Sequence, residues 1–275
     1  MFCVFRYTGA GTAVCNALAQ NTSPPAVFKT ALFSLCQRAA AQGARIMVDA
    51  ENQAYQSTVD AWTVALMRHF NVDGNVVVLN TYQSYLKSCR ATLQSHLQLA
   101  QQQGWTLGVK LVRGAYIQSD PRERIHDSKE ETDRCFNSIV SDLMRKSYPG
   151  VDAGKEFPDV QLFLASHNAE STRSALRLHR QSQPTRPFES GQLQGMADEV
   201  SCEMLDETDK ARSREGGERF QSPEVYKYLS WGSVKECLHY LMRRATENQG
   251  ATERLKEGLV EMRRELKWRI VGGKA

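Results

Sequence analysis

The sequence of 275 residues lacks the signatures of several common classes of protein. No apolar run approaches the roughly 20 residues that a membrane-spanning helix needs. A formal net charge of +4 is too small to indicate a nucleic-acid partner. The seven cysteines are scattered and form no CxxC pair, which is typical of reduced thiols and not of a disulfide framework or a zinc site. The six histidines are also dispersed, so we expect no metal site.

Short catalytic motifs are missing as well. The sequence contains no HExxH, GxSxG or P-loop pattern, and "GAGTAV" (9–14) has Val14 where a dinucleotide-binding fingerprint needs its third glycine. The first residues, "MFCVFRYTGAG", fit neither a secretory signal nor a transit peptide. Hydrophobic residues make up 41% of the chain and charged residues 24%, an ordinary composition for a globular protein.

The sequence does contain a regular alternation of two patterns. Short β-branched runs predict strands at 2–9, 45–50, 75–82, 107–116 and 160–168, and weaker ones at 188–196 and 225–232. Segments with helical periodicity follow at 27–42, 55–70, 84–103, 129–146 and 169–182. Such units favour parallel strands joined by crossover helices. They predict an α/β fold, a (β/α)₈ TIM-type barrel lacking one strand–helix unit, with a doubly wound sheet as the alternative.

We expect residues 1–275 to form this one domain. The polar run at 206–222 has almost no apolar residues and predicts a mobile loop. The charged segment at 251–275 predicts a C-terminal helix that packs outside the barrel.

Polar side chains recur where the predicted strands end. They are Thr8, Asp49, Glu51, Asn80, Gln83, Arg113, Tyr116, Ser166, His167, Gln192, Gln194 and Tyr228. The carboxyl ends of the strands carry the active site in barrels of this kind. We therefore expect a functional site at that end.

The segment "HYLMRRATEN" (239–248) places Arg243 beside Arg244 in a predicted helix. Leu238, Leu241, Met242 and Ala245 recur at helical spacing, which predicts that one face of this helix packs against a core. Two interpretations of the arginine pair are open. Both side chains extend to water, or both aim their donors at one carboxylate.

Seven of these segments together resemble one family. "DAENQAYQ", "NTYQSYLK", "KLVRGAY", "ASHN", "GQLQGMAD", "KYLSWG" and "YLMRRATEN" occur in the order and approximate spacing of proline dehydrogenase, most closely its fungal members. The resemblance extends from about residue 4 to residue 248. It implies a distorted (β/α)₈ barrel with FAD at the carboxyl ends of the strands. It also implies oxidation of L-proline to Δ1-pyrroline-5-carboxylate, electron transfer to membrane quinone, and a mitochondrial location at the inner membrane.

The resemblance also implies a substrate pocket. Arg243 and Arg244 match the pair that grips the substrate carboxylate, and Glu247 matches an acid that holds one arginine in place. The other matching positions are Tyr228 and Leu193 on either side of the substrate ring, Tyr116 in the same pocket, and Asp49 near the substrate. For Asp49, a helix N-cap or a buried salt bridge is the alternative.

The cofactor side follows from the same matches. Lys110 corresponds to a cation near the isoalloxazine, with an ordinary barrel ion pair as the alternative. Gln83 and Asn80 are candidates for hydrogen bonds to the polar edge of the ring, and Arg113, Ser166 and His167 for lining the cofactor. A capping or structural role is the alternative for His167.

Two departures from the family pattern bear on these expectations. Arg6 stands where the family commonly has Lys before Thr8, so the network with Asp49 is expected to differ. A strand that usually precedes 2–9 is missing, which predicts a breach between the first and last strands. Two alternatives to an active proline dehydrogenase follow: an enzyme that prefers hydroxyproline, and a non-catalytic barrel with a binding or regulatory role.

Overall fold

The computed structural model describes residues 1–182, 186–212, 222–247, 262–264 and 266–270. Seven parallel strands form one curled sheet in the order β1-β2-β3-β4-β5-β6-β7. Their bounds are β1 Phe2–Phe5, β2 Arg45–Val48, β3 Val78–Gln83, β4 Leu107–Val112, β5 Val160–Ala165, β6 Glu189–Leu193 and β7 Glu224–Tyr228. Each strand pairs with its neighbour in sequence, whereas a doubly wound sheet reverses its order at one point. The fold is therefore a partial TIM-type barrel, as the sequence predicts.

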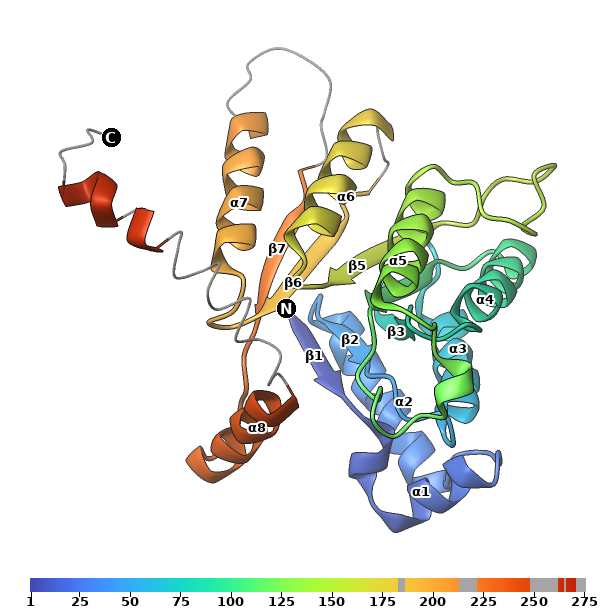
Figure 1. The fold of residues 1–275 in the computed structure, drawn as a ribbon. Coiled ribbons are helices and arrows are strands. Elements are labelled where there is room, and N and C mark those ends of the chain that lie inside the picture. Colours follow the sequence, from blue (N-terminus) through green and yellow to red (C-terminus); the bar gives the residue numbers. More distant parts are fainter. Residues whose placement is uncertain (183–185, 213–221, 248–261, 265, 271–275) are drawn as a thin grey trace.

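Helices alternate with the strands. They are α1 Thr12–Ala19, α2 Ala26–Ala41, α3 Gln56–Phe70, α4 Cys89–Gln103, α5 Lys129–Met144, α6 Ala169–Ser182, α7 Asp198–Arg212 and α8 Val234–Glu247, with short 3₁₀ helices η1 Tyr7–Ala10 and η2 Arg122–Arg124. Those between α2 and α7 cover the outer side of the curled sheet, whereas α8 lies away from it (Figure 1). At the start of α5, the Ser128 hydroxyl accepts a hydrogen bond from the Glu131 backbone N–H at 3.2 Å. This N-cap explains why the helix begins there.

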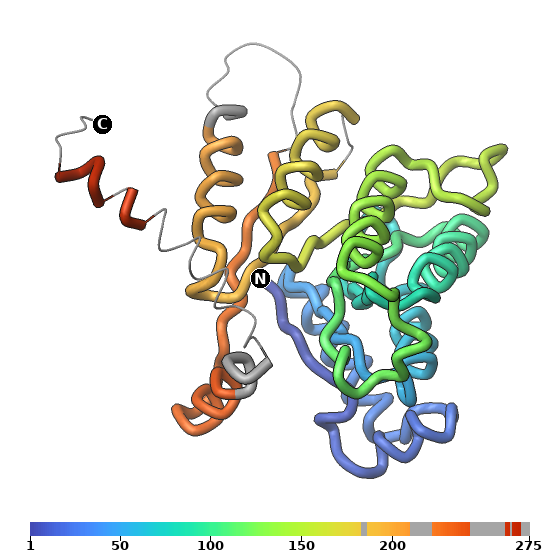
Figure 2. The backbone as a smooth tube through the Cα atoms, viewed as in Figure 1, coloured from blue at the N-terminus to red at the C-terminus, as the bar shows by residue number. Residues whose placement is uncertain are grey.

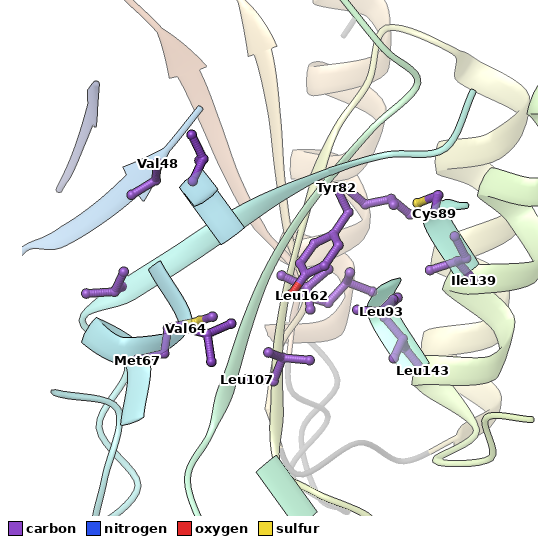
Figure 3. Close-up of a cluster of buried hydrophobic side chains, with 14 of the residues drawn as sticks. Val48, Val64, Met67, Tyr82, Cys89, Leu93, Leu107, Ile139, Leu143 and Leu162 are labelled. Atoms are coloured by element: carbon purple, nitrogen blue, oxygen red, sulfur yellow. The ribbon is translucent and has the colours of Figure 1, made fainter. Parts of the chain in front are cut away.

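Side chains of the central strands alternate between two cores. On β3, Val78 and Tyr82 belong to the large cluster between the sheet and its helices, whereas Leu79 belongs to a smaller cluster inside the barrel. Figure 3 shows part of the outer cluster, with Tyr82 lying near Leu93 of α4 and Leu162 of β5. Because a strand has a period of two, Asn80 faces the helices and Gln83 faces the interior.

The interior of the barrel is filled by aromatic and aliphatic side chains. Met47, Leu79 and Phe163 are buried there, and Phe2 packs against them. The ring centroid of Phe2 lies 4.8 Å from that of Tyr226 on β7 in an edge-on contact. Packed side chains thus connect the first and last strands at their amino ends.

The two outer strands of the sheet do not pair with each other. Among the described residues, β1 hydrogen-bonds only β2 and β7 hydrogen-bonds only β6. Their carboxyl ends diverge in Figure 1, and the tube in Figure 2 shows the same separation between the blue and the orange chain. The predicted breach between the first and last strands is confirmed. Two unpaired backbone edges border it.

The prediction of a mobile loop over 206–222 is wrong for its first part. Residues 206–212 belong to helix α7, and 213–221 lie outside the described residues. Val200 and Met204 are each 1% exposed, Ser201 is 4% exposed and Thr208 is 5% exposed, so a narrow stripe of the helix is buried. This stripe is enough to dock a helix that is otherwise polar.

Other boundaries also differ from the predicted ones. The first strand ends at Phe5, not at residue 9, because Tyr7 leaves the sheet and packs between Phe28 and Trp62 with its hydroxyl 3.1 Å from Thr63. Helix α1 has no counterpart in the sequence prediction. In the charged segment at 251–275, residues 262–264 and 266–270 are helical, and the rest lies outside the described residues.

The apolar face predicted for the helix around Arg243 does not reach a core. Leu238, Leu241 and Met242 on α8 are 54%, 54% and 66% exposed. The physical reason is the direction of β7, which carries α8 away from β1 and leaves this face uncovered (Figure 1). Among the described residues, no helix is both long and apolar enough to span a bilayer.

Glu189 gives the fold a dependence on pH. Its side chain is 1% exposed, one carboxylate oxygen forms an ion pair with Arg45, and the other has no hydrogen-bond partner within the described part of the chain. Burial raises the pKa of Glu189 from 4.5 to about 7, although Arg45 acts in the opposite direction. Between these two values the folded state holds a proton that the unfolded state has released. The free energy of unfolding therefore falls as the pH rises through this window.

As the pH rises from 5 to 8, we expect the free energy of unfolding of Glu189→Gln to increase relative to that of the unaltered chain. The expected increase is on the order of 1–3 kcal/mol. Denaturant unfolding at both pH values measures this difference. Glu203→Gln is the matched control, because Glu203 pairs with Arg173 at an exposed position. The interpretation is wrong if the two variants show the same change with pH.

Candidate active site at the carboxyl ends of the strands

Three charged side chains meet inside the carboxyl end of the sheet. Lys110 lies on β4, and Asp49 lies just beyond β2. Lys110 Nζ donates to Asp49 Oδ1 at 2.5 Å. Arg6 Nε, just beyond β1, lies 3.6 Å from the other Asp49 oxygen. Lys110 is 9% exposed, so this cation is held almost entirely within the protein. Arg6 and Lys110 both pair with Asp49, and for Lys110 this is the barrel ion pair given above as its alternative role.

Glu51 extends this group of charges. It is 4% exposed and accepts hydrogen bonds from the Thr8 hydroxyl at 2.7 Å and the Tyr116 hydroxyl at 3.3 Å. The guanidinium of Arg6 lies 5.7 Å from the centroid of the Tyr116 ring. We call these six residues the mouth cluster: Arg6, Thr8, Asp49, Glu51, Lys110 and Tyr116. It combines two cations with two carboxylates around one phenol.

The electrostatics of the mouth cluster hold its tyrosine neutral. Burial raises the pKa of Tyr116 to about 12, with Arg6 acting to lower it and Glu51 and Asp49 acting to raise it. Burial also acts to lower the pKa of Arg6, but Tyr116, Asp49 and Glu51 together raise it. Near neutral pH the tyrosine is therefore a hydrogen-bond donor and the arginine a permanent cation.

Gln83 fixes the loops around the mouth cluster. Its amide nitrogen donates to the Glu51 carbonyl at 3.4 Å, and its amide oxygen accepts from the Ala115 backbone N–H at 3.0 Å. Asp120 makes a second tie, accepting from the Gln53 backbone N–H at 3.0 Å and from the Tyr85 hydroxyl. The loops after β2 and β4 are thus held together over the end of β3.

The structure separates three other predicted residues from the mouth cluster. Asn80 is fully buried and donates to Asp60 of α3 at 2.8 Å, on the helix side of the sheet. The guanidinium of Arg113 binds Asp133 of α5 at 2.6 Å and the Ser166 hydroxyl at 2.7 Å, and it stacks over Phe136. These contacts place Asn80, Arg113 and Ser166 in the layer between sheet and helices.

The ends of β5 and β6 are connected by His167. Its Nε2 accepts a hydrogen bond from the Leu193 backbone N–H at 3.1 Å. Gln192 is 2% exposed and donates to the Ser166 carbonyl at 3.4 Å. His167 and Leu193, predicted on the cofactor and substrate sides respectively, are therefore neighbours.

Tyr228 ends β7, and its ring centroid lies 5.8 Å from that of Tyr240 on α8. This contact joins the last strand to the helix that carries the arginine pair. The backbone of Arg243, Arg244 and Glu247 is helical, as predicted. Their side chains lie outside the described residues.

The sequence prediction omitted three members of the mouth cluster from the site residues. Arg6 was named only as a departure from the family pattern. Thr8 and Glu51 were recognised only as polar strand ends. Glu51 lies two residues after Asp49, and Thr8 lies two residues after Arg6. For Glu51 that spacing of two is a usable signal, since alternate residues of an extended segment face the same side. Thr8 lies in the 3₁₀ helix η1, where this rule does not apply.

The chain is similar to known proteins over most of its length. The family profile described as proline dehydrogenase matches residues 7–257. The chain belongs to the proline dehydrogenase family. A probable mitochondrial proline dehydrogenase of Schizosaccharomyces pombe is 36% identical over 250 residues, which cover 86% of this chain and 49% of the relative. Mitochondrial proline dehydrogenase 1 of Caenorhabditis elegans is 33% identical over 252 residues, which cover 88% of this chain and 38% of that relative.

Solved structures of proline utilization A share the fold. The protein from Bdellovibrio bacteriovorus, inactivated by N-propargylglycine, matches with a TM-score of 0.69 and 18% identity over 89% of this chain and 24% of that one. A protein from Bradyrhizobium japonicum matches with a TM-score of 0.66 and 20% identity over 90% of this chain and 24% of that one. The chain spans about half or less of the length of the proline dehydrogenases above.

Proposed function

We propose that this protein takes part in FAD-dependent oxidation of L-proline to Δ1-pyrroline-5-carboxylate, the first step of proline catabolism. Membership of the proline dehydrogenase family supports the reaction. The observation that carries the proposal is the mouth cluster, where the buried Lys110 and the more exposed Arg6 both pair with Asp49 at the carboxyl ends of the strands. Active sites of barrels of this type lie at that end.

The donors of the mouth fit a flavin. Bound FAD would accept a hydride from the carbon next to the proline nitrogen. Lys110 is a buried cation at the end of β4, and a positive charge there stabilises an anionic reduced ring. Gln83 would hydrogen-bond the polar edge of the cofactor, and His167 would line it. Asn80, Arg113 and Ser166 would act from behind the sheet, where their hydrogen bonds fix the walls of the site.

The substrate would lie between the mouth cluster and α8. Arg243 and Arg244 would bind its carboxylate, with Glu247 one helical turn away to hold one of them in place. Tyr228 and Leu193 would pack on the two faces of the ring, and Tyr116 would close the pocket from the side of β4. Asp49 would hold both cations in position through its ion pairs with Lys110 and Arg6. Positioning of this kind lowers a barrier without a strong base.

The electron acceptor belongs to the same proposal. Relatives from several organisms are named mitochondrial proline dehydrogenases. We place this protein in the mitochondrion, on the matrix side of the inner membrane, with membrane quinone as its acceptor. A non-catalytic barrel is the second candidate, and the unpaired edges of β1 and β7 are the observation that favours it.

Substrate choice tests the proposal. In flavin-loaded enzyme we expect proline to have a higher kcat/KM than pipecolate or trans-4-hydroxy-L-proline, because pocket walls built of Tyr228 and Leu193 offer an apolar fit to an unsubstituted five-membered ring. Steady-state reduction of a quinone analogue measures all three. The highest value for hydroxyproline would assign the protein to that substrate. Flavin binding without turnover of any of the three would favour the non-catalytic barrel.

A further inference from the structure

A chain of hydrogen bonds extends from helix α3 to the mouth of the barrel. Asp60 lies one turn after Gln56, the first residue of α3, so the two side chains share one face of the helix. The Gln56 amide nitrogen donates to Asp60 Oδ1 at 2.8 Å, and the amide oxygen accepts from the Glu51 backbone N–H at 2.7 Å. Asn80 on β3 donates to the same Asp60 oxygen at 2.8 Å. Asp60 is therefore joined through one side chain to a member of the mouth cluster.

Asp60 fixes the direction of these hydrogen bonds. An ionised carboxylate only accepts hydrogen bonds, so both amides must turn their nitrogens toward it. Gln56 is then left with its oxygen toward the Glu51 N–H, where its nitrogen would place donor against donor. Asn80 is left with its oxygen buried and without a hydrogen-bond partner among the described residues. A buried oxygen without a partner costs free energy, which indicates that Asp60 dominates the choice of orientation.

The charge of Asp60 strengthens its hold on the two amides. Burial raises the pKa of Asp60 to about 6, with the two amide donors acting in the opposite direction, so the carboxylate is mainly ionised at neutral pH. Burial also raises the pKa values of Tyr7 and Tyr82, and the charge of Asp60 acts in the same direction, so both phenols stay neutral. The amides therefore donate to a charged acceptor, and such a hydrogen bond is roughly twice as strong as a neutral one.

Glu51 is the member of the mouth cluster that these contacts hold. Its backbone is fixed on both sides, since the N–H donates to Gln56 and the carbonyl accepts from Gln83 at 3.4 Å. Its carboxylate accepts from the Thr8 hydroxyl at 2.7 Å and from the Tyr116 hydroxyl at 3.3 Å. A shift of the Glu51 backbone therefore moves the phenol that closes the substrate pocket in the proposed function.

We propose that Asp60 is a positioning residue for the proline site at the mouth of the barrel. It sets the orientation of the Gln56 amide, and through this amide it fixes Glu51 against Tyr116. Asp60 meets Asn80 on the helix side of the sheet, so it would contact neither substrate nor cofactor. The link to proline rests on the proposed function, whereas the chain of hydrogen bonds does not.

Two substitutions disturb the direction of the chain singly and restore it together. Asp60→Asn keeps the shape of the side chain but removes the charge and replaces one acceptor oxygen by a donor. Gln56→Glu keeps an acceptor for the Glu51 N–H but sets a second carboxylate against Asp60. In the double variant a donor at position 60 meets an acceptor at position 56, and the other carboxylate oxygen remains for the Glu51 N–H. Each single variant should therefore disturb Glu51, and the double variant should relieve the disturbance.

Hydrogen exchange of the Glu51 backbone amide, followed by NMR in the folded chain, measures this effect without an activity assay. We expect each single variant to speed exchange at Glu51 by roughly threefold to tenfold, since its hydrogen bond is weakened. The double variant should return to within about twofold of the unaltered chain. The backbone amide of Val77 is the internal reference, because it donates to the Asn71 side-chain oxygen at 2.8 Å, an acceptor of the same kind outside this chain of contacts.

Proline kinetics of the flavin-loaded enzyme test the link to the substrate. Asp60→Asn should raise the KM for proline by roughly threefold to tenfold with unchanged flavin absorbance, and the double variant should restore the KM. Asp159→Asn is the matched control, because Asp159 precedes β5 at the amino ends of the strands and pairs with Arg186. It should change neither the KM nor the exchange at Glu51.

Unchanged exchange at Glu51 in Asp60→Asn, or a double variant as disturbed as the single ones, would overturn the proposal. Equal acceleration at Val77 would also overturn it, since the effect would then be a general loss of stability. A normal KM beside altered exchange would separate Asp60 from the substrate site. If the unaltered enzyme oxidises no proline, the proposed function fails, and the exchange rates still decide whether Asp60 holds Glu51.

Discussion

Arg243→Met or Arg244→Met raises the KM for proline by roughly tenfold to a hundredfold or more, because each charge-assisted contact to the carboxylate contributes about 1.5–3 kcal/mol. The two side chains project about 100° apart on α8 and can close on one carboxylate from two sides. Flavin content should change little, since the substrate carboxylate and the cofactor are bound by different side chains. Steady-state kinetics and the flavin absorbance of the same preparation measure both effects.

Lys235→Met is the matched control for the arginine pair. Lys235 is exposed on the same helix, about two turns before Arg243. Its substitution therefore removes one positive charge from α8 away from the arginine pair. An unchanged KM in both arginine variants returns the pair to the interpretation in which the side chains extend to water. An equal increase in Lys235→Met would assign the effect to the net charge of the helix.

Residues 1–275 alone should retain roughly tenfold less FAD than a chain of the length of its relatives. The reason is that only those molecules whose site is fully assembled can bind, so the apparent affinity falls with their fraction. The unpaired edges of β1 and β7 are the physical reason. Closing them directly would change the strand number and the barrel radius together. Turnover of proline should fall at least in parallel with the flavin content.

Flavin absorbance and proline oxidation, compared between the two lengths of chain, check this result. Circular dichroism is the control, since the seven-stranded sheet should be folded in both. Full flavin occupancy with robust turnover in the shorter chain would show that the edges of β1 and β7 need no further strand. Equally low flavin occupancy in the chains of both lengths would mean that the unpaired edges are not the cause, and that the mouth cluster itself binds FAD weakly.

Much of the architecture could be predicted from local sequence. Apolar β-branched runs alternate with helical periodicity, and a strand followed by a helix returns to the sheet in parallel. Seven units without a reversal therefore specify a curled sheet whose carboxyl ends share one side. The seven observed strands all overlap the predicted runs, from β1 at Phe2–Phe5 to β7 at Glu224–Tyr228. Helix α7 was missed because only two of its buried residues, Val200 and Met204, are apolar.

The orientation of each polar strand end was harder to predict. Lys110 and Arg113 are three residues apart, so the period of two sends them to opposite sides of the sheet. Lys110 reaches Asp49 inside the barrel, whereas Arg113 reaches Asp133 of α5. The same rule separates Gln83 from Asn80. The spacing was visible in the sequence, but which side was the interior depended on the curl of the sheet.

Contacts between distant segments were decided by tertiary structure alone. Arg45 and Glu189 stand on different strands, β2 and β6, and only the curl of the sheet brings their charges into contact. Likewise, the spacing of Leu238, Leu241 and Met242 predicts an apolar helix face, but the direction of β7 leaves that face exposed. Periodicity is a local property that the chain encodes residue by residue. Burial depends on what another segment places opposite, and for α8 the diverging edges of β1 and β7 decide it.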